Sequence, residues 1–430
     1  MVTGLKKGEI TKDYITKLNF PPFLKKIFLL LAVIGPGLIT ANIDNDAGGI
    51  ATYSLTGAQT GYRLLWVLIP ITVALIMVQE MSARMGISSG KGLADLIRER
   101  FGLKITFYTI IFLVVADLGN TMAEFAGIAS AGEIFGISKY VSVPICSVFV
   151  WLLILKGNYK TVERVFLIGC ALYISYVISG FIIGPSFTDI ASAIFTPDFK
   201  EIQRSDFPII VGLIGTSITP WMQFYIQSAV VEKGLTPKDL THSKIDVILG
   251  CSTMVTVTIF IVICCAATLF NSGIIINNAK DAAMALAPLA GKYASTLFAF
   301  GLFNASIFAA ALLPLATSYY VCEGMGWESG VDKTFREAPN FFSIFTGIIA
   351  ISAFLILIPG INLFNILIWS QIINGILIPI VLLYIIKLCN DPDVMGEYTN
   401  TPIYNLVSYL IVFLMVAANI IFIYFEIKKF

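Results

Sequence analysis

The chain has 430 residues, of which 57% are hydrophobic and 13% are charged, and its mean hydropathy is +0.86. These values exclude a soluble globular domain and indicate an all-α protein with many membrane-spanning helices. The formal net charge of +1 gives no reason to expect a nucleic-acid partner, so the lipid bilayer is the expected surrounding.

We predict about 11 transmembrane helices, because a hydrocarbon core of about 30 Å takes about 20 helical residues. The predicted spans are 27–58, 62–82, 104–133, 139–156, 162–184, 208–231, 246–270, 293–322, 340–358, 362–388 and 403–427. Residues 1–26 are polar and basic without the features of a cleaved signal peptide, so we expect a cytoplasmic N-terminal segment. Residues 27–430 should form one transmembrane domain.

The basic residues predict the orientation. With the N-terminus inside, most of the 28 Lys and Arg residues fall in cytoplasmic segments, among them Arg84, Lys91 and Lys244. We therefore expect a multi-pass protein of the plasma membrane, in a bacterium the inner membrane, with a cytoplasmic N-terminus.

The first predicted span is interrupted at its centre. Gly35-Pro36-Gly37 is followed by Asp44-Asn45-Asp46-Ala47-Gly48-Gly49 inside an otherwise apolar stretch. Irregular backbone at that depth persists only where it lines a cavity, and a carboxylate there usually marks a functional site. We predict that Asp46 binds a cation together with backbone carbonyls from Ile43 onward. The two glycines after it would let the helix unwind.

Asp46 can also cap the second half of this helix through backbone N–H groups, and capping is compatible with cation binding. Asp44 is a secondary candidate, either as a second ligand or as an anion that raises the local cation concentration.

The sixth predicted span is interrupted in the same way, at Gly215-Thr216-Ser217-Ile218-Thr219-Pro220. Paired broken helices are the best sequence indication of a transporter's substrate site. Thr216 and Thr219 are candidate oxygen ligands, although Ser and Thr in membrane helices more often bond to their own backbone. Four further spans follow each break. The chain therefore divides into repeat one, about 27–184, and an inverted repeat two, about 208–388, with an extra helix at about 403–427.

Two further spans carry polar side chains. Glu124 and Asp117 in span three can line the ion path or relay protons, or they can be structural hydrogen-bond partners. Gln371 and Asn374 in span ten lie three residues apart, hence on one helix face, and Asn365 extends this amide stripe. Gln371 is a candidate ligand, and hydrogen bonding between helices is its alternative role.

The histidine and cysteine content excludes several kinds of site. The only histidine, His242, is predicted in a cytoplasmic loop, which argues against a His-based zinc or iron site. The seven cysteines form no C-x-x-C pair and lie mostly in apolar spans, where we expect small buried hydrophobic side chains.

Short motifs over nearly the whole chain match one family of transporters. They are Gly35-Pro36-Gly37, Gly57-Ala58-Gln59-Thr60-Gly61-Tyr62-Arg63-Leu64-Leu65-Trp66, Ser82-Ala83-Arg84-Met85-Gly86-Ile87, Gly90-Lys91, Arg98-Glu99-Arg100, Ala123-Glu124-Phe125, and Ser370-Gln371 with Pro379. Together they resemble the Nramp family of divalent-metal transporters. The resemblance implies a five-plus-five inverted repeat, the amino-acid transporter-like fold, with a central metal site and no enzymatic activity.

The chain departs from the Nramp pattern at its ligands. Where the family has Asp-Pro-Gly-Asn, this chain has Asp46-Ala47-Gly48-Gly49, so Gly49 leaves room in place of an asparagine ligand. Where the family has Met-Pro-His, alignment on the proline gives Thr219-Pro220-Trp221. The family's proton-accepting aspartate in span three corresponds to Thr121, whereas its glutamate is kept as Glu124.

These departures resemble the Nramp-related magnesium transporters. Loss of a thioether leaves oxygen donors, which suit a hard cation, and Mg²⁺ prefers few protein ligands and retained waters. We expect an alternating-access transporter that moves a largely hydrated Mg²⁺, and also Mn²⁺, past Asp46 without proton coupling and without a cofactor. The alternatives are a proton-coupled Mn²⁺ or Fe²⁺ transporter of the ordinary Nramp type and a sodium-coupled amino-acid transporter. An intramembrane metalloenzyme is disfavoured, because the chain has no H-E-x-x-H motif.

Overall fold

The computed structural model describes residues 45–156, 173–331 and 333–428, and every regular element in these ranges is a helix. The longer helices are α4 (Ala47–Thr60), α5 (Leu68–Ser89), α6 (Leu93–Phe101), α7 (Leu103–Ile134), α8 (Lys139–Lys156), α10 (Ile174–Ile183), α11 (Phe187–Phe195), α12 (Asp206–Ser217), α13 (Pro220–Glu232), α14 (Leu240–Cys265), α17 (Ala294–Met325), α18 (Pro339–Ile356), α19 (Leu363–Cys389) and α21 (Pro402–Ile427). The short helices are α15 (Ala279–Ala283), α16 (Ala287–Ala290) and α20 (Pro392–Met395).

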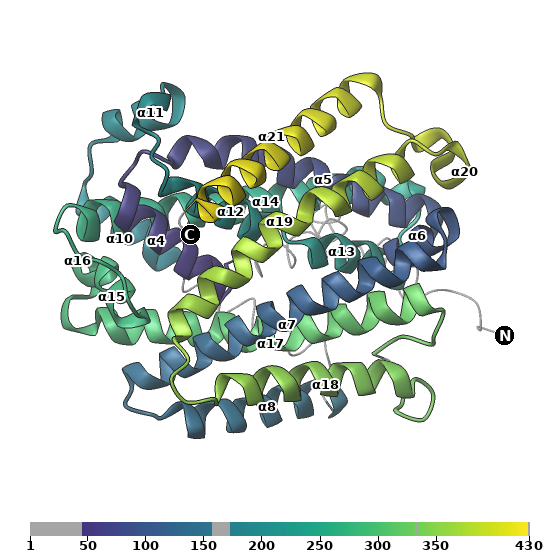
Figure 1. The fold of residues 1–430 in the computed structure, drawn as a ribbon, viewed down its shortest axis with the longest axis horizontal. Coiled ribbons are helices and arrows are strands. Elements are labelled where there is room, and N and C mark those ends of the chain that lie inside the picture. Colours follow the sequence, from purple (N-terminus) through teal and green to yellow (C-terminus); the bar gives the residue numbers. More distant parts are fainter. Residues whose placement is uncertain (1–44, 157–172, 332, 429–430) are drawn as a thin grey trace, which may run out of the picture.

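The long helices pack side by side along a common direction (Figure 1). Helices α7 and α17 pack along each other, with α8 and α18 outside them on one side and α19 and α21 on the other. Helices α6 and α20 lie at one end of this bundle, and α11, α15 and α16 lie at the other. We call these the α6 end and the α11 end.

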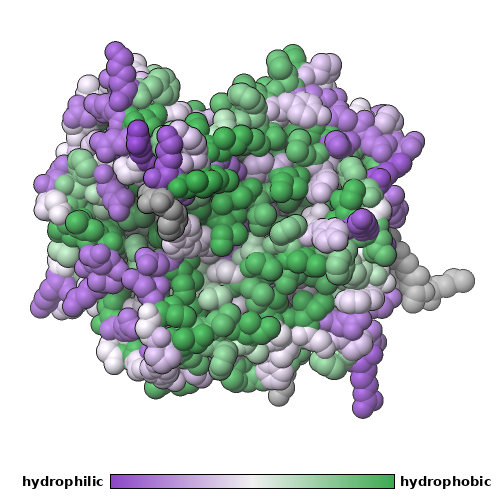
Figure 2. Space-filling view, in the orientation of Figure 1, coloured by the Kyte–Doolittle hydropathy of each residue, from purple (hydrophilic) through white to green (hydrophobic). Residues whose placement is uncertain are grey.

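The surface matches a membrane protein. Figure 2 shows apolar side chains over the middle of the visible face and hydrophilic ones gathered toward its left and right edges, which are the two ends of the bundle. Within the described ranges, eight helices are long and apolar enough to cross a membrane, or nine if the bent pair α10 and α11 is one span. Most of predicted span 27–58 and part of span 162–184 lie outside the described residues.

Several predicted boundaries are wrong. Helix α5 begins six residues after the predicted start at 62 and runs to Ser89, because a 3₁₀ turn at Leu65–Val67 precedes it. Helix α14 begins at Leu240, so His242 lies in its first turn rather than in a loop. Two segments expected to be loops contain α6 and α11, and α11 is bent 117° from α10.

The second broken span lies at the centre of the bundle. In the most apolar stretch of α12 and α13, 94% of the residues are buried, against 28% in α21. Helix α12 approaches α19 so closely that a methyl group on Gly215 would lie 1.9 Å from the Gln371 carbonyl oxygen and 2.3 Å from the Gly375 nitrogen. Glycine is therefore required at position 215, and the contact fixes half of the broken helix against α19.

The cysteines behave as the sequence predicts. Cys146, Cys251, Cys264, Cys265, Cys322 and Cys389 are free and buried, and Cys170 lies outside the described residues.

Candidate metal site at two broken helices

The first break lies directly before α4. Asp46 has an extended backbone, with φ −69° and ψ −175°, and its carboxylate accepts the Gly49 N–H at 2.6 Å. Asp46 is therefore the N-cap of α4, which is the capping role that the sequence predicted as compatible with cation binding. It is also buried, with 6% of its surface exposed. One carboxylate oxygen holds the start of α4.

The predicted role of the two glycines at the first break is wrong. Gly48 and Gly49 lie in the first turn of α4, and the extended residue is Asp46. A methyl group on Gly48 would lie 2.0 Å from the Gln371 side-chain nitrogen, so this glycine makes room for α19 rather than unwinding the helix. Ile43 and Asp44 lie outside the described residues.

The second break is confirmed. Helix α12 ends at Ser217, Ile218 and Thr219 leave the helical conformation, and α13 begins at Pro220. Proline suits the first helical position, where its missing N–H costs no hydrogen bond. The last carbonyls of α12 therefore have no partners from a continuing helix, and the C-terminal end of a helix carries partial negative charge.

The threonines at this break differ from those in α4. Thr52, Thr56 and Thr60 each donate to the carbonyl four residues earlier, at 2.7 to 2.8 Å. The hydroxyls of Thr216 and Thr219 are buried and have no hydrogen-bond partner among the described residues. A buried hydroxyl without a partner is costly, so these two groups are available for a ligand or its water. Ser217 instead lies 3.4 Å from the Tyr53 hydroxyl.

Gln371 connects the two breaks. Its side-chain amide lies against Gly48 in α4, and its backbone carbonyl lies against Gly215 in α12. The amide nitrogen donates to the Ser370 hydroxyl at 3.1 Å, and the amide oxygen accepts from Asn374 at 3.3 Å. Helix α19 thus places an amide group beside the start of α4 and contacts α12 through the backbone of the same residue.

Glu124 joins the first break from α7. The Ala47 N–H donates to one Glu124 oxygen at 3.4 Å, and the other oxygen is buried without a hydrogen-bond partner in the part of the chain that the structure describes. The Asp46 and Glu124 carboxyl groups are close enough to interact electrostatically. Two neighbouring buried carboxyl groups disfavour each other's ionised form, so this pair favours a bound proton or a bound cation.

Asp117 is placed differently. Its carboxylate accepts from Tyr320 at 2.9 Å, Thr317 at 3.0 Å and Asn120 at 3.1 Å. Asp117 therefore links α7 to α17 by hydrogen bonds. This geometry fits its predicted alternative role as a structural hydrogen-bond partner.

The amide stripe of α19 divides into separate roles. Asn374 exchanges hydrogen bonds with Asn120 at 2.8 and 3.2 Å, which is a contact between helices. Asn365 lies exposed in the first turn of α19, so extending the stripe to it is wrong.

Sequence reasoning missed several polar groups beside the first break. The Asn45 side chain is buried, and neither its oxygen nor its nitrogen has a partner in the described ranges. Its backbone carbonyl accepts from the Tyr173 hydroxyl at 2.6 Å. The Ser306 hydroxyl in α17 is also buried without a partner in these ranges. Asn45 stands between two aspartates in the sequence, which was a usable signal. No sequence motif around Tyr173 or Ser306 indicates that these residues lie near the first break.

Together these elements supply oxygen donors at the two breaks, and Gln371 contacts both. The donors are a carboxylate, two hydroxyls, an amide and the carbonyl end of α12. In the part of the chain that the structure describes, no group of three or more His, Cys, Asp or Glu side chains is placed to hold a metal ion.

Comparison with known proteins identifies the family. The sequence profile of Nramp, described as natural resistance-associated macrophage protein-like, matches residues 37–425. The chain belongs to the Nramp family. Relatives include the divalent metal cation transporters MntH of Aeromonas hydrophila, 27% identical over 90% of this chain and 94% of the relative, and of Bacillus subtilis, 24% identical over 91% of each chain.

Solved structures confirm the predicted fold. The manganese transporter of Eremococcus coleocola, in complex with an aromatic bis-isothiourea compound, aligns with a TM-score of 0.73 at 21% identity over 97% of this chain and 90% of that one. MhsT, solved with L-phenylalanine, aligns with a TM-score of 0.60 at 14% identity over 92% and 98%. The Nramp chain therefore has the amino-acid transporter-like fold built from an inverted repeat.

Proposed function

We propose that this Nramp protein is an alternating-access transporter of divalent cations whose main substrate is Mg²⁺, with Mn²⁺ as a second substrate. The α6 end would face the cytoplasm in the plasma membrane. Membership of a family that contains MntH divalent metal cation transporters supports the general function. The choice of ion rests on the donors at the two breaks.

The observation that carries the proposal is the pair of buried hydroxyls at the second break, Thr216 and Thr219, which have no hydrogen-bond partner among the described residues. The capped Asp46 carboxylate lies at the first break. Hydroxyl, amide and carboxylate oxygens are hard donors and favour Mg²⁺ over softer transition ions. Mg²⁺ loses its water reluctantly and usually binds one or two carboxylates while keeping several waters. Thr216, Thr219 and Gln371 would hold those waters, and Asp46 would supply the charge.

The helix ends favour a cation at this point. The carbonyl end of α12 adds partial negative charge to the Asp46 carboxylate. The N-terminal end of α4 carries partial positive charge, and the Asp46 carboxylate that caps this end offsets that charge. Residues 218 and 219 form an irregular link between α12 and α13, so one half-helix can move while the other stays packed. Alternating movement of the halves would open the site to each side in turn.

The direct test is Mg²⁺ uptake by proteoliposomes that contain a Mg²⁺-sensitive dye. The proposal predicts an inward Mg²⁺ flux that protein-free liposomes lack and that Asp46→Asn abolishes. Mn²⁺ uptake without any Mg²⁺ flux would reject Mg²⁺ as the substrate while keeping the family's general activity.

One observation favours a second candidate, a proton-coupled Mn²⁺ or Fe²⁺ transporter. The contact between Asp46 and Glu124 provides a site for a proton that metal binding would displace. An internal pH dye separates the candidates, because coupled transport acidifies the lumen as Mn²⁺ enters. Our proposal predicts an unchanged internal pH, with Glu124→Gln still transporting Mg²⁺.

A further inference from the structure

We propose that the cavity between α5 and α14 near the α6 end is a binding site for the headgroup of an anionic phospholipid. The cavity has a volume of about 140 Å³, similar to engineered cavities of about 150 Å³ that hold benzene. Its lining residues include Glu80, Arg84, Thr241, Ser243, Lys244 and Val247. None of these residues belongs to the candidate metal site.

The charge of this cavity suits an anion. Glu80 is occupied, because its two oxygens accept from the Arg84 side chain at 2.9 Å and the Tyr404 hydroxyl at 2.8 Å. Lys244 is exposed and has no ion pair or hydrogen bond among the described residues. The cavity therefore carries two cationic side chains against one anionic one, and the uncompensated charge is on Lys244.

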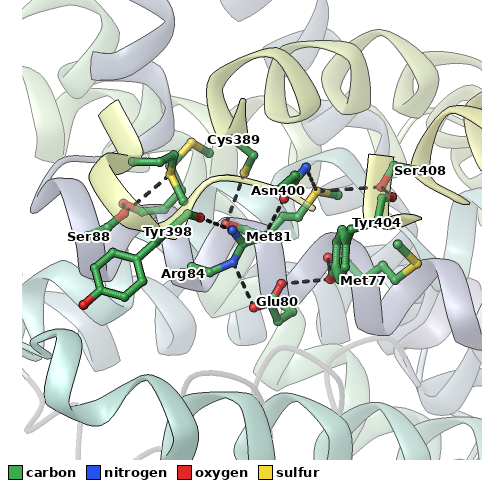
Figure 3. A network of polar contacts seen from close by, with 12 residues as sticks. Met77, Glu80, Met81, Arg84, Ser88, Cys389, Tyr398, Asn400, Tyr404 and Ser408 are labelled. Atoms are coloured by element: carbon green, nitrogen blue, oxygen red, sulfur yellow. Dashed lines mark hydrogen bonds and ion pairs between the residues drawn. The ribbon is translucent and has the colours of Figure 1, made fainter. Parts of the chain in front are cut away.

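Arg84 can donate to a headgroup without giving up its present contacts. Its guanidinium binds Glu80, the Tyr398 carbonyl and the Asn400 side chain, as Figure 3 shows. A guanidinium has five N–H groups, so two remain. The contacts to Tyr398 and Asn400 hold the segment before α21 and fix the position of the Arg84 side chain.

The depth of the cavity fits a lipid headgroup. Arg84 lies five residues before the end of α5, and Lys244 lies four residues after the start of α14. At 1.5 Å per residue, both charges lie about 6 to 8 Å from these helix ends. Charged side chains near the ends of membrane-spanning helices suit the headgroup region of a bilayer.

The helix surface beyond the cavity fits acyl chains. Ile245, Ile248 and Leu249 continue α14 from Lys244 toward the membrane centre, and 38%, 38% and 46% of their surfaces are exposed. A lipid with its phosphate beside Lys244 and Arg84 would lay its chains on this apolar face. Because the cationic cavity adjoins this apolar face, one phospholipid can contact both, whereas a free phosphate ion can contact only the cavity, so we choose the lipid as the occupant.

The test measures binding of phosphatidylglycerol to the full chain in detergent by native mass spectrometry, with phosphatidylcholine as the uncharged comparison. Phosphatidylglycerol should bind the unaltered chain more tightly, and Lys244→Gln should weaken its binding about fivefold, equivalent to about 1 kcal/mol. Lys104→Gln is the matched control, because Lys104 is an exposed lysine in the first turn of α7 at the same end of the bundle.

Three results would overturn the proposal. Equal binding of the two lipids would remove the role of charge. Equal losses in Lys244→Gln and Lys104→Gln would leave only diffuse attraction to the protein. Full displacement of phosphatidylglycerol by millimolar inorganic phosphate would identify a site for free anions instead of a lipid.

Discussion

At the scale of single residues, Asp46 combines two roles that can be separated. Its carboxylate caps α4 through the Gly49 N–H, and its charge is available to a cation. Asp46→Asn keeps a capping oxygen but removes the charge, whereas Asp46→Ala removes both. We expect both variants to lose transport, and only Asp46→Ala to lose about 1 kcal/mol of stability. Metal uptake and thermal unfolding measure the two effects, and substantial transport by Asp46→Asn would leave Asp46 as a cap alone.

The unpartnered hydroxyls at the second break allow a sharper prediction. Thr216→Val and Thr219→Val keep the shape of each side chain but remove a hydroxyl that has no partner. Unfolding should be unchanged or shifted to higher temperature, because a buried unpaired polar group is lost. The KM for Mg²⁺ should rise about tenfold, because one polar contact to the hydrated ion disappears.

Thr56→Val is the control for these two variants, since the Thr56 hydroxyl bonds to its own helix at 2.7 Å. It should leave the KM for Mg²⁺ unchanged. If Thr216→Val and Thr219→Val also leave the KM unchanged while remaining folded, the two hydroxyls do not contact the transported ion.

At the scale of elements, the contact of α12 with α19 fixes the position of the first half of the second broken helix. A methyl group on Gly215 would lie 1.9 Å from a backbone oxygen of α19, whereas one on Gly212, in the same helix, would first meet side chains at 3.5 and 3.7 Å. Gly215→Ala should therefore lower the melting temperature strongly, because backbone cannot move aside.

Gly212→Ala should be neutral or stabilising by up to about 1 kcal/mol, since alanine is the better helix former. Thermal unfolding of both variants in detergent compares them directly. Similar melting temperatures would contradict the close backbone contact between α12 and α19.

The sequence predicted where helices are interrupted, but it predicted only some of the roles of the residues at these interruptions. Pro220 ends one helix and starts the next through its own chemistry, so the second break follows from a single residue. At the first break the described residues show Asp46 extended before α4, and the roles of Gly48 and Gly49 there were mispredicted. The role of Gly48 depends on α19, which is more than 300 residues away in the chain. The positions of Tyr173 and Ser306 beside Asn45 and Ala47 likewise depend on tertiary packing.

At the scale of the whole molecule, hydropathy predicted most of the long helices in the described ranges, because lipid leaves the backbone few alternatives. It failed at the ends of the bundle, where α6 and α11 are helical segments outside the predicted spans and α14 extends to Leu240. There the chain leaves the apolar layer, and water can satisfy the backbone of an irregular segment as well as that of a helix.

The selectivity of the whole transporter tests the central claim most directly. If the site at Asp46, Thr216, Thr219 and Gln371 binds a hydrated ion through hard oxygens, Mg²⁺ and Mn²⁺ should compete for it, and Ca²⁺, which takes more oxygen ligands, should compete less well. The measurement is the rate of Mn²⁺ uptake into proteoliposomes as external Mg²⁺ rises. We predict that millimolar Mg²⁺ suppresses Mn²⁺ uptake; an unchanged rate would contradict the magnesium assignment and leave a transition-metal transporter in its place.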